Sequence, residues 1–524
     1  MKRRNTTILF LLFSLFLICG IIHFQYHNSP MAFYHHGSTF QHGNNPIPVI
    51  FPDPFQLHRP NVKTEKYLSY LPHSGFHNQR IELENALLLA TYLNRTLLVP
   101  PVFLASPAMP WLRYEKLYER LLFQTKNGLD HCVKIYDAAL PLPSECLNNF
   151  RWTNVPWTFF YNMSAIQENT GAPLIFRSGL DYEWLYQSRH ELGRIREDDI
   201  YFFKDMSPYE YQIHDDESLD LPLDRFNYRI DLTSLEKIEH RVLHFGSLFG
   251  SYRVLAETEE HIQLLRNIRS NMIFANPVLS TATKRIVQQL GGANNFVGMH
   301  VRVGDGIFKL RASILVDDVY HHLVNTFTDL SLEQVAAYEG GIEQHDLDRT
   351  ESAEYEIKLR TFHPVDETNY TKPIEVHHPL WTEKEKQSLF NKNPHIASRL
   401  KCQQGDAVTN RFRNTVIYIA TDAPDPRNHP LLRKLFNVFP CTFILSDFMD
   451  ELNDIKRLEV VEEKVRLESY LIPMVDAMIS AHAHTFFGTP HSTFTSYIER
   501  QLHPVYTGKE VQVMSLLDYL NSMP

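Results

Sequence analysis

The sequence is short of cysteine, has no excess of basic residues and contains one long apolar run. Its 524 residues include five cysteines and carry a formal net charge of −10. Without a basic stripe to neutralise phosphates, nucleic acid is not expected as a partner. The motifs G-x-S-x-G, G-x-x-x-x-G-K-[ST] and H-E-x-x-H are absent, so nothing indicates a serine hydrolase, a P-loop enzyme or a zinc protease.

The length and composition are those of a folded protein with more than one domain. Hydrophobic residues make up 44% and charged residues 21% of the chain, as in ordinary globular proteins. Because single cores stop growing near about 250–300 residues, the length predicts two domains with accessory segments. No internal repeat of about 20–50 residues is visible, so a repeat architecture is not indicated.

The apolar run lies at the N-terminus. Residues 8–24 are almost entirely apolar, and three basic residues precede them at positions 2–4. A run of this length is near the lower limit for crossing a bilayer, and the basic flank predicts a cytoplasmic N-terminal end. We expect a cytoplasmic tail at 1–7, a transmembrane signal anchor at 8–24 and a stalk at 25–62. A cleaved signal peptide is the competing interpretation.

The expected anchor predicts a single-pass type II protein of the Golgi or endoplasmic reticulum membrane, with most of the chain in the lumen. A short span suits the thinner membranes of the early secretory pathway. Segment 25–62 is rich in His, Pro, Asn and Gly, as expected of a flexible stalk.

Four cysteines lie outside the apolar run, and they can pair in three ways. Local pairing is the simplest arrangement, which gives Cys132–Cys146 and Cys402–Cys441. Their spacing contains no C-x-x-C, so a zinc site is not indicated.

Three N-x-[ST] sequons are potential glycosylation sites in the lumen. They begin at Asn94, Asn162 and Asn369.

Hydrophobic periodicity beyond the stalk predicts a βαβ unit. Tyr67–Leu71 is a strand candidate, a glycine turn follows, and a helical pattern runs over Gln79–Asn94. Thr96–Val99 reads as the next strand. This unit begins a Rossmann-like N-terminal lobe over residues 63–270.

The second half of the chain predicts another doubly wound lobe, over residues 271–524. The expected strands are Asn295–Val301, Thr415–Ala420, Cys441–Leu445 and Thr485–Phe487. The expected helices are Leu279–Leu290, His429–Phe439, Glu462–Ala483 and Thr493–Leu502. We therefore predict an α/β fold in which two Rossmann-like lobes face a cleft.

An acidic insert at about 330–400 interrupts the second lobe, and we expect it to be an excursion from the fold. It contains Asp346-Leu347-Asp348, an Asp-x-Asp pair of the type that can hold a divalent metal. No strand precedes this pair, so we expect no metal there. His482 and His484 have a spacing suited to two ligands, but no carboxylate accompanies them, which favours a structural role.

Three motifs, far apart in the chain, follow expected strands, where open α/β sheets bind ligands. They are Gly75-Phe76-His77-Asn78-Gln79-Arg80, His300-Val301-Arg302-Val303-Gly304-Asp305 and Gly488-Thr489-Pro490-His491-Ser492-Thr493-Phe494. Their wide separation predicts that they meet between the two lobes.

The second motif centres on Arg302, whose planar guanidinium can bind two phosphate oxygens at once. His300 lies on the same strand face and can donate to the same diphosphate or orient the arginine. Asp305 can lock the turn or hold Arg302. An ordinary ion pair at a strand end is the alternative.

The first and third motifs each begin a helix. Ser492 is the expected N-cap of its helix, so free N–H groups point at whatever lies before it, and a phosphate suits that end. Phe494 can pack on a base. Gly75 allows close approach of the backbone, and Asn78 offers an amide. A purely structural helix cap is the alternative for both motifs.

Asp476 precedes Ser492 by sixteen residues and lies on an otherwise apolar helix face. A buried carboxylate needs partners. Guanine offers two donors, N1–H and the exocyclic amine, that one carboxylate can accept together. A structural ion pair is equally compatible with the sequence.

Together these motifs resemble the GDP-fucose protein O-fucosyltransferase family of glycosyltransferases. The resemblance runs in chain order through the first motif with Leu93–Pro101, the second motif, Val416–Asp422 and Met474–Phe494. It spans most of residues 65–505. It implies a GT-B fold, inversion at the anomeric carbon and catalysis without a metal or other cofactor.

The resemblance also implies roles for single residues. The implied donor-binding residues are Gly75, Phe76, Asn78, His300, Arg302, Asp476, Ser492, Thr493 and Phe494. Arg302 and Asn78 are the implied catalytic residues. Some family members carry an acidic general base just before the first glycine, but Ser74 stands there in this chain, so the base is unassigned.

We therefore expect a metal-independent, inverting fucosyltransferase that moves fucose from GDP-fucose to a hydroxyl of a glycoprotein or glycan acceptor. A transferase that uses another GDP-sugar is one alternative. A non-catalytic lumenal glycan-binding or scaffold protein is another, and the missing acid at position 74 favours it. The combination of Arg302, Asp476 and Ser492 favours the enzyme, because a scaffold has no reason to keep a diphosphate site.

Overall fold

In a computed structural model of the chain, the structure describes residues 45–49, 51, 61, 64–124, 126–136, 141–187, 192–304, 306–328, 330–339 and 415–521. The described residues from 46 onward belong to one compact unit. The expected anchor at 8–24 and most of the expected insert at 330–400, including Asp346 and Asp348, lie outside the described residues. Within the described part, no helix has both the length and the apolar character needed to cross a membrane.

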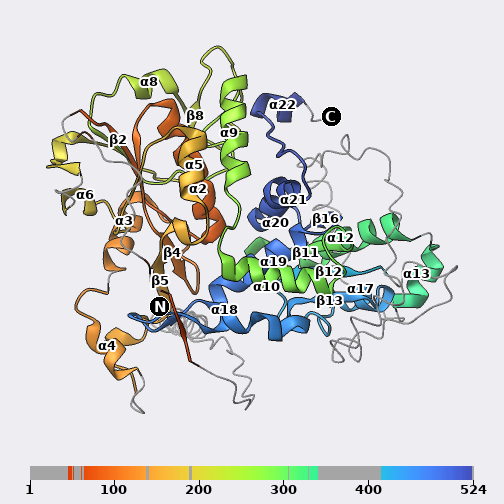
Figure 1. Cartoon of the computed structure of the whole chain (residues 1–524). Coiled ribbons are helices and arrows are strands. Elements are labelled where there is room, and N and C mark those ends of the chain that lie inside the picture. Colours follow the sequence, from red (N-terminus) through yellow and green to blue (C-terminus); the bar gives the residue numbers. More distant parts are fainter. Residues whose placement is uncertain are drawn as a thin grey trace, which may run out of the picture. The chain divides into compact units, whose positions relative to one another are not determined.

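A five-stranded sheet forms from the first half of the chain, in the order β6-β3-β2-β10-β7, with every neighbouring pair parallel (Figure 1). Its strands are β2 (Tyr67–Tyr70), β3 (Thr96–Val99), β6 (Leu174–Phe176), β7 (Ile200–Phe203) and β10 (Val242–Phe245). The predicted βαβ unit is present as β2, helix α2 (Phe76–Tyr92) and β3.

The remaining elements of this half surround the sheet. Its helices are α3 (Tyr114–Phe123), α4 (Asp130–Ile135), α5 (Met163–Thr170), α6 (Trp184–Gln187), α8 (Leu232–Glu236) and α9 (Glu259–Asn271). Two short pairs of strands are antiparallel β4 (Val102–Ala105) with β5 (Trp152–Val155), and parallel β8 (Tyr211–His214) with β9 (Tyr228–Asp231).

A four-stranded parallel sheet forms from the second half, in the order β13-β12-β11-β16. Its strands are β11 (Val297–Val301), β12 (Ile417–Thr421), β13 (Thr442–Ile444) and β16 (Thr485–Gly488). Its helices are α10 (Pro277–Gln289), α11 (Gly306–Leu310), α12 (Ala312–Phe327), α13 (Leu332–Glu339), α17 (Arg433–Val438), α18 (Asn453–Arg457), α19 (Glu468–Ala481), α20 (Thr493–Tyr497), η7 (Ile498–Leu502), α21 (His503–Tyr506) and α22 (Leu516–Asn521). The predicted α/β fold with parallel sheets is confirmed.

Among the predicted helix boundaries, the start at Glu462 departs most from the structure. The expected helix over Glu462–Ala483 begins only at Glu468, because β14 (Leu458–Val460) and β15 (Val465–Arg466) form an antiparallel hairpin before it. Lys464, in the turn of this hairpin, has φ 51°, a left-handed conformation that interrupts a right-handed helix. Strand β1 (Ile47–Pro48), in the segment assigned to the stalk, pairs in parallel with β14.

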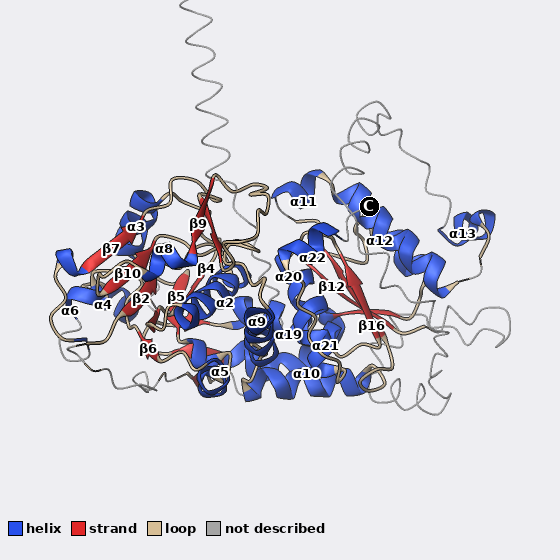
Figure 2. Ribbon diagram, turned by 90° about the horizontal axis from the view of Figure 1, so that it is seen from above, coloured by secondary structure: helices blue, strands red, loops and turns tan. Residues whose placement is uncertain are grey.

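Both sheets contribute to one continuous hydrophobic core. Buried side chains of this cluster include Leu68 and Leu243 from the five-stranded sheet and Tyr418 and Phe443 from the four-stranded sheet. Figure 2 shows α9 between the two groups of strands. The two halves therefore share apolar packing instead of only facing each other.

A buried cluster of charged residues joins the halves at helix α2. Glu84 accepts hydrogen bonds from Arg80 (3.1 Å), from Arg269 on α9 (2.9 and 2.7 Å) and from Gln501 on η7 (3.0 Å). Burial opposes ionisation of this carboxyl, but the two arginines outweigh it and lower the pKa of Glu84. The carboxylate is thus charged at neutral pH and fixes α2 against segments from both halves.

The end of the chain returns to the first half. The carboxylate of Glu257 accepts hydrogen bonds from the backbone N–H groups of Leu516 (2.7 Å) and Leu517 (3.1 Å) at the start of α22. Leu516 packs with Leu221 and Leu255. The C-terminal helix is thereby held on residues that precede the second sheet.

Two of the three sequons are described by the structure. The side chains of Asn94 and Asn162 are exposed, and Asn369 lies outside the described residues.

The Glu84 cluster makes a stability prediction. Glu84→Gln keeps the shape of the side chain but leaves the buried Arg80 and the partly exposed Arg269 without their carboxylate, which we expect to cost about 3–5 kcal/mol. The matched control is Glu119→Gln, which breaks an exposed pair with Lys116 and should cost less than about 1 kcal/mol. Urea unfolding of the two variants measures the difference. Equal losses would contradict the structural role of Glu84.

Candidate functional site

The three motifs lie at the switch points of the two sheets, where the order of strands along the sheet reverses. In the five-stranded sheet the reversal is between β2 and β10, and the first motif follows β2. In the four-stranded sheet it is between β11 and β16, which lead into the second and third motifs. Open α/β sheets bind ligands outside the carboxyl ends of such strands.

Gln79 fixes the turn of the first motif. Its side-chain nitrogen donates to the carbonyl oxygens of Ser74 (3.0 Å) and Phe103 (2.8 Å), and its side-chain oxygen accepts from the Phe103 N–H (2.9 Å). Ser74 has a left-handed φ of 66°. Gly75 is the N-cap of α2, and a Cβ added there would lie 3.7 Å from Ala108. The packing of the protein therefore does not by itself require glycine at position 75.

A buried serine, histidine and glutamate stand behind this turn. The Ser247 hydroxyl lies 2.8 Å from Nε2 of His73, and Oε1 of Glu82 lies 3.4 Å from the same nitrogen. A nucleophilic triad needs the serine and the carboxylate on different imidazole nitrogens, and all three side chains are buried. The group therefore supports the turn: Glu82 also accepts a hydrogen bond from the His73 N–H (3.2 Å).

Asp422, at the end of β12, fixes the turn of the second motif. Its carboxylate accepts hydrogen bonds from the N–H groups of Val303 (2.7 Å) and Gly304 (3.0 Å). It also lies 3.9 Å from Nε of Arg302. A Cβ at Gly304 would lie 2.7 Å from the carboxylate, so glycine is needed there. Asp305, expected to lock this turn, lies outside the described residues.

Arg302 lies with its guanidinium 4.4 Å from the centre of the Phe308 ring on α11. Its side chain is 27% exposed. The guanidinium is thus oriented from one side by an aromatic ring and from another by Asp422, while part of it stays open to solvent.

The third motif packs directly on the second. Thr489 donates its N–H to the His300 carbonyl (2.9 Å) and accepts from the Arg302 N–H at its hydroxyl (3.0 Å). A Cβ at Gly488 would lie 2.8 Å from the His300 oxygen, so only glycine permits this approach. The predicted N-cap is confirmed: the Ser492 hydroxyl accepts from the Thr495 N–H (3.4 Å).

Aromatic contacts bring all three motifs together. The Phe494 ring of the third motif lies 4.4 Å from the His300 ring of the second and 5.2 Å from the His77 ring of the first, measured between centroids. His77 also lies 5.3 Å from Tyr497. Helices α2 and α20, which carry His77 and Phe494, are neighbours in Figure 1.

The two histidines of this contact are neutral at physiological pH. Burial, together with Arg302, lowers the pKa of His300 to about 3. Burial and the cations Arg80 and Arg302, with His300, lower the pKa of His77 well below its ordinary value. The Nδ1 of His300 is hydrogen-bonded to the Thr495 hydroxyl (2.7 Å). Arg302 is thus the group that can bring positive charge to an anion here.

Asp476, on α19, accepts a hydrogen bond from the Tyr418 hydroxyl of β12. Burial raises the pKa of Asp476 to about 7, although the tyrosine opposes this shift. No lysine or arginine in the described part of the chain forms an ion pair with it, so the described residues do not support the ion-pair interpretation.

The structure places Phe76 in an aromatic cluster. Its ring lies 5.0 Å from Phe160, 5.7 Å from Trp157 and 6.0 Å from Phe274. Asn78 is half-buried, and its side-chain amide makes no hydrogen bond within the described residues. Phe76 and Asn78 were both expected to contact GDP-fucose. Of the two, Asn78 is the residue with polar side-chain atoms that can bind a ligand.

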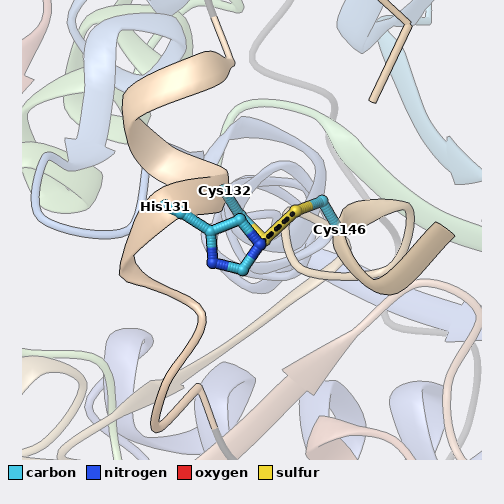
Figure 3. A group of neighbouring side chains, drawn as sticks. All are labelled: His131, Cys132 and Cys146. Carbon is cyan, nitrogen blue, oxygen red and sulfur yellow. Dashed lines mark hydrogen bonds between the residues drawn. A yellow bond between two sulfur atoms is a disulfide. The ribbon is translucent and has the colours of Figure 1, made fainter. Parts of the chain in front are cut away.

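Within the described part of the chain, His131, Cys132 and Cys146 form a group whose atoms lie close enough together to be considered as metal ligands (Figure 3). The two cysteines form a disulfide, which is the pairing expected from the sequence. The imidazole Nε2 lies 3.7 Å from each sulfur. Because a metal binds thiolates, the intact disulfide does not offer a site.

Other candidate ligands are engaged elsewhere. Cys441 is also disulfide-bonded, while its expected partner Cys402 lies outside the described residues. His482 bonds the Met478 carbonyl through Nδ1 (2.7 Å), and His484 bonds the Thr485 hydroxyl (2.9 Å).

Sequence reasoning missed three residues of the site: His77, Thr489 and Asp422. His77 and Thr489 stand inside the quoted motifs, but only the packing of Phe494 and the second motif reveals their contacts. Asp422 ends a predicted strand, and its position beside β11 in the sheet is the signal that could have found it.

Comparison with known proteins finds one relative by sequence. O-fucosyltransferase 30 of Arabidopsis thaliana is 60% identical over 38 residues, which is 7% of this chain and 8% of that protein. The chain resembles the O-fucosyltransferases. The matched segment is a small part of the length of both proteins. No family model matches the chain. The resemblance to the O-fucosyltransferases that the motifs predicted is confirmed.

Among solved structures, the chain is similar to crystal structures of POFUT1. The complex with GDP-fucose gives a TM-score of 0.34 at 11% identity, covering 85% of this chain and 96% of that one. The complex with GDP gives a TM-score of 0.35 at 13% identity, and the match covers 85% of this chain and 97% of the POFUT1 chain.

The contact between Gly304 and Asp422 predicts a coupled effect on stability. Gly304→Ala should cost roughly 1–3 kcal/mol, because the new methyl group displaces a carboxylate that holds two backbone N–H groups. In the Asp422→Ala background the same substitution should cost clearly less. Unfolding free energies of the two single variants and the double variant measure this coupling. Additive losses would show that the carboxylate does not impose glycine at position 304.

Proposed function

We propose that the chain is an inverting, metal-independent fucosyltransferase of the GT-B type. It transfers fucose from GDP-fucose to a hydroxyl of a protein or glycan acceptor. The observation that carries the proposal is the meeting of three separate motifs at two switch points, through His77, His300 and Phe494. The name of the plant relative supports the same activity.

The diphosphate of the donor is assigned to Arg302. Its guanidinium lies against the Phe308 ring and near Asp422 and is partly exposed, so an anion can reach it. As the acceptor oxygen attacks C1 of fucose, the bond from C1 to the phosphate oxygen breaks and its electron pair leaves with GDP. Arg302 stabilises that developing charge, and Ser492 and Thr493 add donors beside it.

The guanine base is assigned to Asp476. With a pKa of about 7, this carboxyl is only partly ionised in the free protein. The two guanine donors need the ionised form, so base binding pulls the carboxyl toward it. Phe494 lines the base, and the turn of Gly75, Phe76 and Asn78 contacts the diphosphate and fucose.

In this proposal residues 63–270 form the lobe on the acceptor side and residues 271–524 form the GDP-sugar lobe. The apolar run at 8–24 anchors the chain in the Golgi or endoplasmic reticulum membrane as a type II protein. The Cys132–Cys146 disulfide supports a lumenal location, because disulfides persist in oxidising compartments. A transferase for another GDP-sugar has the same support from Arg302 and Asp476.

Nucleotide binding tests the base assignment. We expect GDP to raise the melting temperature of the protein in EDTA, by an equivalent of about 2.7 kcal/mol at a hundredfold excess over Kd. UDP and CMP lack the guanine donors and should not do so. Asp476→Ala should abolish the GDP effect. A protein unaffected by all three nucleotides would instead favour a glycan-binding scaffold.

The role of Arg302 predicts a catalytic loss. Arg302→Ala should slow GDP release from GDP-fucose by 10²–10³, or about 3–4 kcal/mol in the barrier, because the leaving phosphate loses its cation. Arg225→Ala is the control, since this arginine is exposed and stacks on Tyr209. Near-normal turnover of Arg302→Ala would contradict the assignment of the diphosphate to Arg302.

A further inference from the structure

His77 is a side chain of the site with a buried ring nitrogen that no described residue bonds. It lies in the first turn of α2, and its ring packs against Phe494 and Tyr497. Its Nδ1 is buried and has no hydrogen-bond partner among the described residues. A buried nitrogen left unpaired is destabilising. Because this one lies where the three motifs meet, it is available to a group of a bound substrate.

Three carboxylates near this turn, among the residues that the structure describes, already accept hydrogen bonds within the protein. Glu82 accepts from His73 and Ser247, and Glu84 accepts from two arginines and Gln501. Asp422 accepts from two backbone N–H groups beside Arg302. Glu82 and Glu84 are buried away from a substrate. Asp422 is 38% exposed, but each of its two oxygens already accepts a backbone N–H. Ser74 stands where some members of the family carry an acidic base.

The surroundings of His77 keep it unprotonated. Arg80 faces it from α2, His300 and Arg302 face it from β11 and the turn that follows, and Phe494 and Tyr497 pack on it from α20. Burial and the two arginines lower the pKa of His77, so its imidazole is neutral at physiological pH. A neutral imidazole with a free nitrogen can accept a proton.

We propose that His77 is the general base of the transfer, a role that rests on the proposed function. Its imidazole takes the proton of the acceptor hydroxyl while the hydroxyl oxygen bonds to C1 of the sugar. The bond from C1 to the phosphate oxygen breaks, and its electron pair leaves with the nucleoside diphosphate. The resulting imidazolium returns the proton to solvent.

The position of His77 suits this role. It comes from the half that carries the five-stranded sheet, whereas Arg302 comes from the other half. Inversion needs the base and the group that stabilises the leaving phosphate on opposite sides of the anomeric carbon. The negative diphosphate also offsets the charge of Arg302, so the proton affinity of His77 rises when the donor is bound.

The test uses the full-length protein and measures GDP release from GDP-fucose, with water as the acceptor. His77→Phe keeps a ring against Phe494 and Tyr497 but has no nitrogen. His77→Asn keeps an amide that can hydrogen-bond but cannot take the proton. We expect both to lower kcat by 10²–10⁴ while the thermal stabilisation by GDP is retained. His240→Phe, at an exposed histidine, is the control and should behave as wild type.

The pH profile gives a second readout. A base is active when unprotonated, so the wild-type rate should fall as the pH falls through its pKa. In the free enzyme the pKa of His77 is low, so we expect kcat/KM to fall only at a pH below the ordinary histidine range. Because the bound donor raises the pKa of His77, kcat should begin to fall at a higher pH than kcat/KM does. Both decreases should be absent from His77→Phe.

Each contrary outcome has a distinct meaning. Normal turnover of His77→Asn would overturn the proposal, since a hydrogen bond alone would then suffice. Loss of GDP stabilisation in both variants would overturn it in favour of a donor-binding role. If the wild-type protein is stabilised by GDP but releases no GDP from GDP-fucose, the role of His77 as general base is overturned while the nucleotide site stands. A wild-type protein not stabilised by GDP overturns the proposed function itself.

Discussion

The geometry of the site depends on how helix α2 is held against the second half of the chain. Glu84 binds Arg80 on its own helix, Arg269 on α9 and Gln501 on η7. The same helix carries His77 in its first turn, and the His77 ring packs on Phe494, seven residues before Gln501. The buried Glu84 carboxylate thus ties the helix that follows the first motif to the segment that follows the third motif.

The site combines two neutral histidines with one arginine. His77 and His300 are neutral because they are buried beside cations, and the partly exposed Arg302 carries the positive charge. If His77 and His300 were protonated, they and Arg302 would be three adjacent cations that repel one another in the absence of an anion. Neutral imidazoles avoid that repulsion and still offer one donor and one acceptor each.

Sequence periodicity predicted the strands that end in the motifs, because parallel strands buried on both faces are continuous apolar runs. It also predicted Ser492 as an N-cap, which is a local property. It failed at Glu462, where a left-handed Lys464 turns the chain into a hairpin. It could not predict the contact of His77 with Phe494 or of Asp422 with Gly304, since both depend on strand order in the sheets and on how the halves pack.

The scaffold alternative can be weighed by what each site residue does for the fold. Gly488, Gly304 and Asp422 are explained by backbone packing alone, and a scaffold would keep them. His77 is different, because an apolar ring would pack equally well against Phe494 and Tyr497 without burying an unpaired nitrogen. Asp476 likewise has one tyrosine hydroxyl as a partner and no ion pair among the described residues. Both polar groups are costly for the fold alone, and a bound nucleotide sugar with its acceptor would satisfy both.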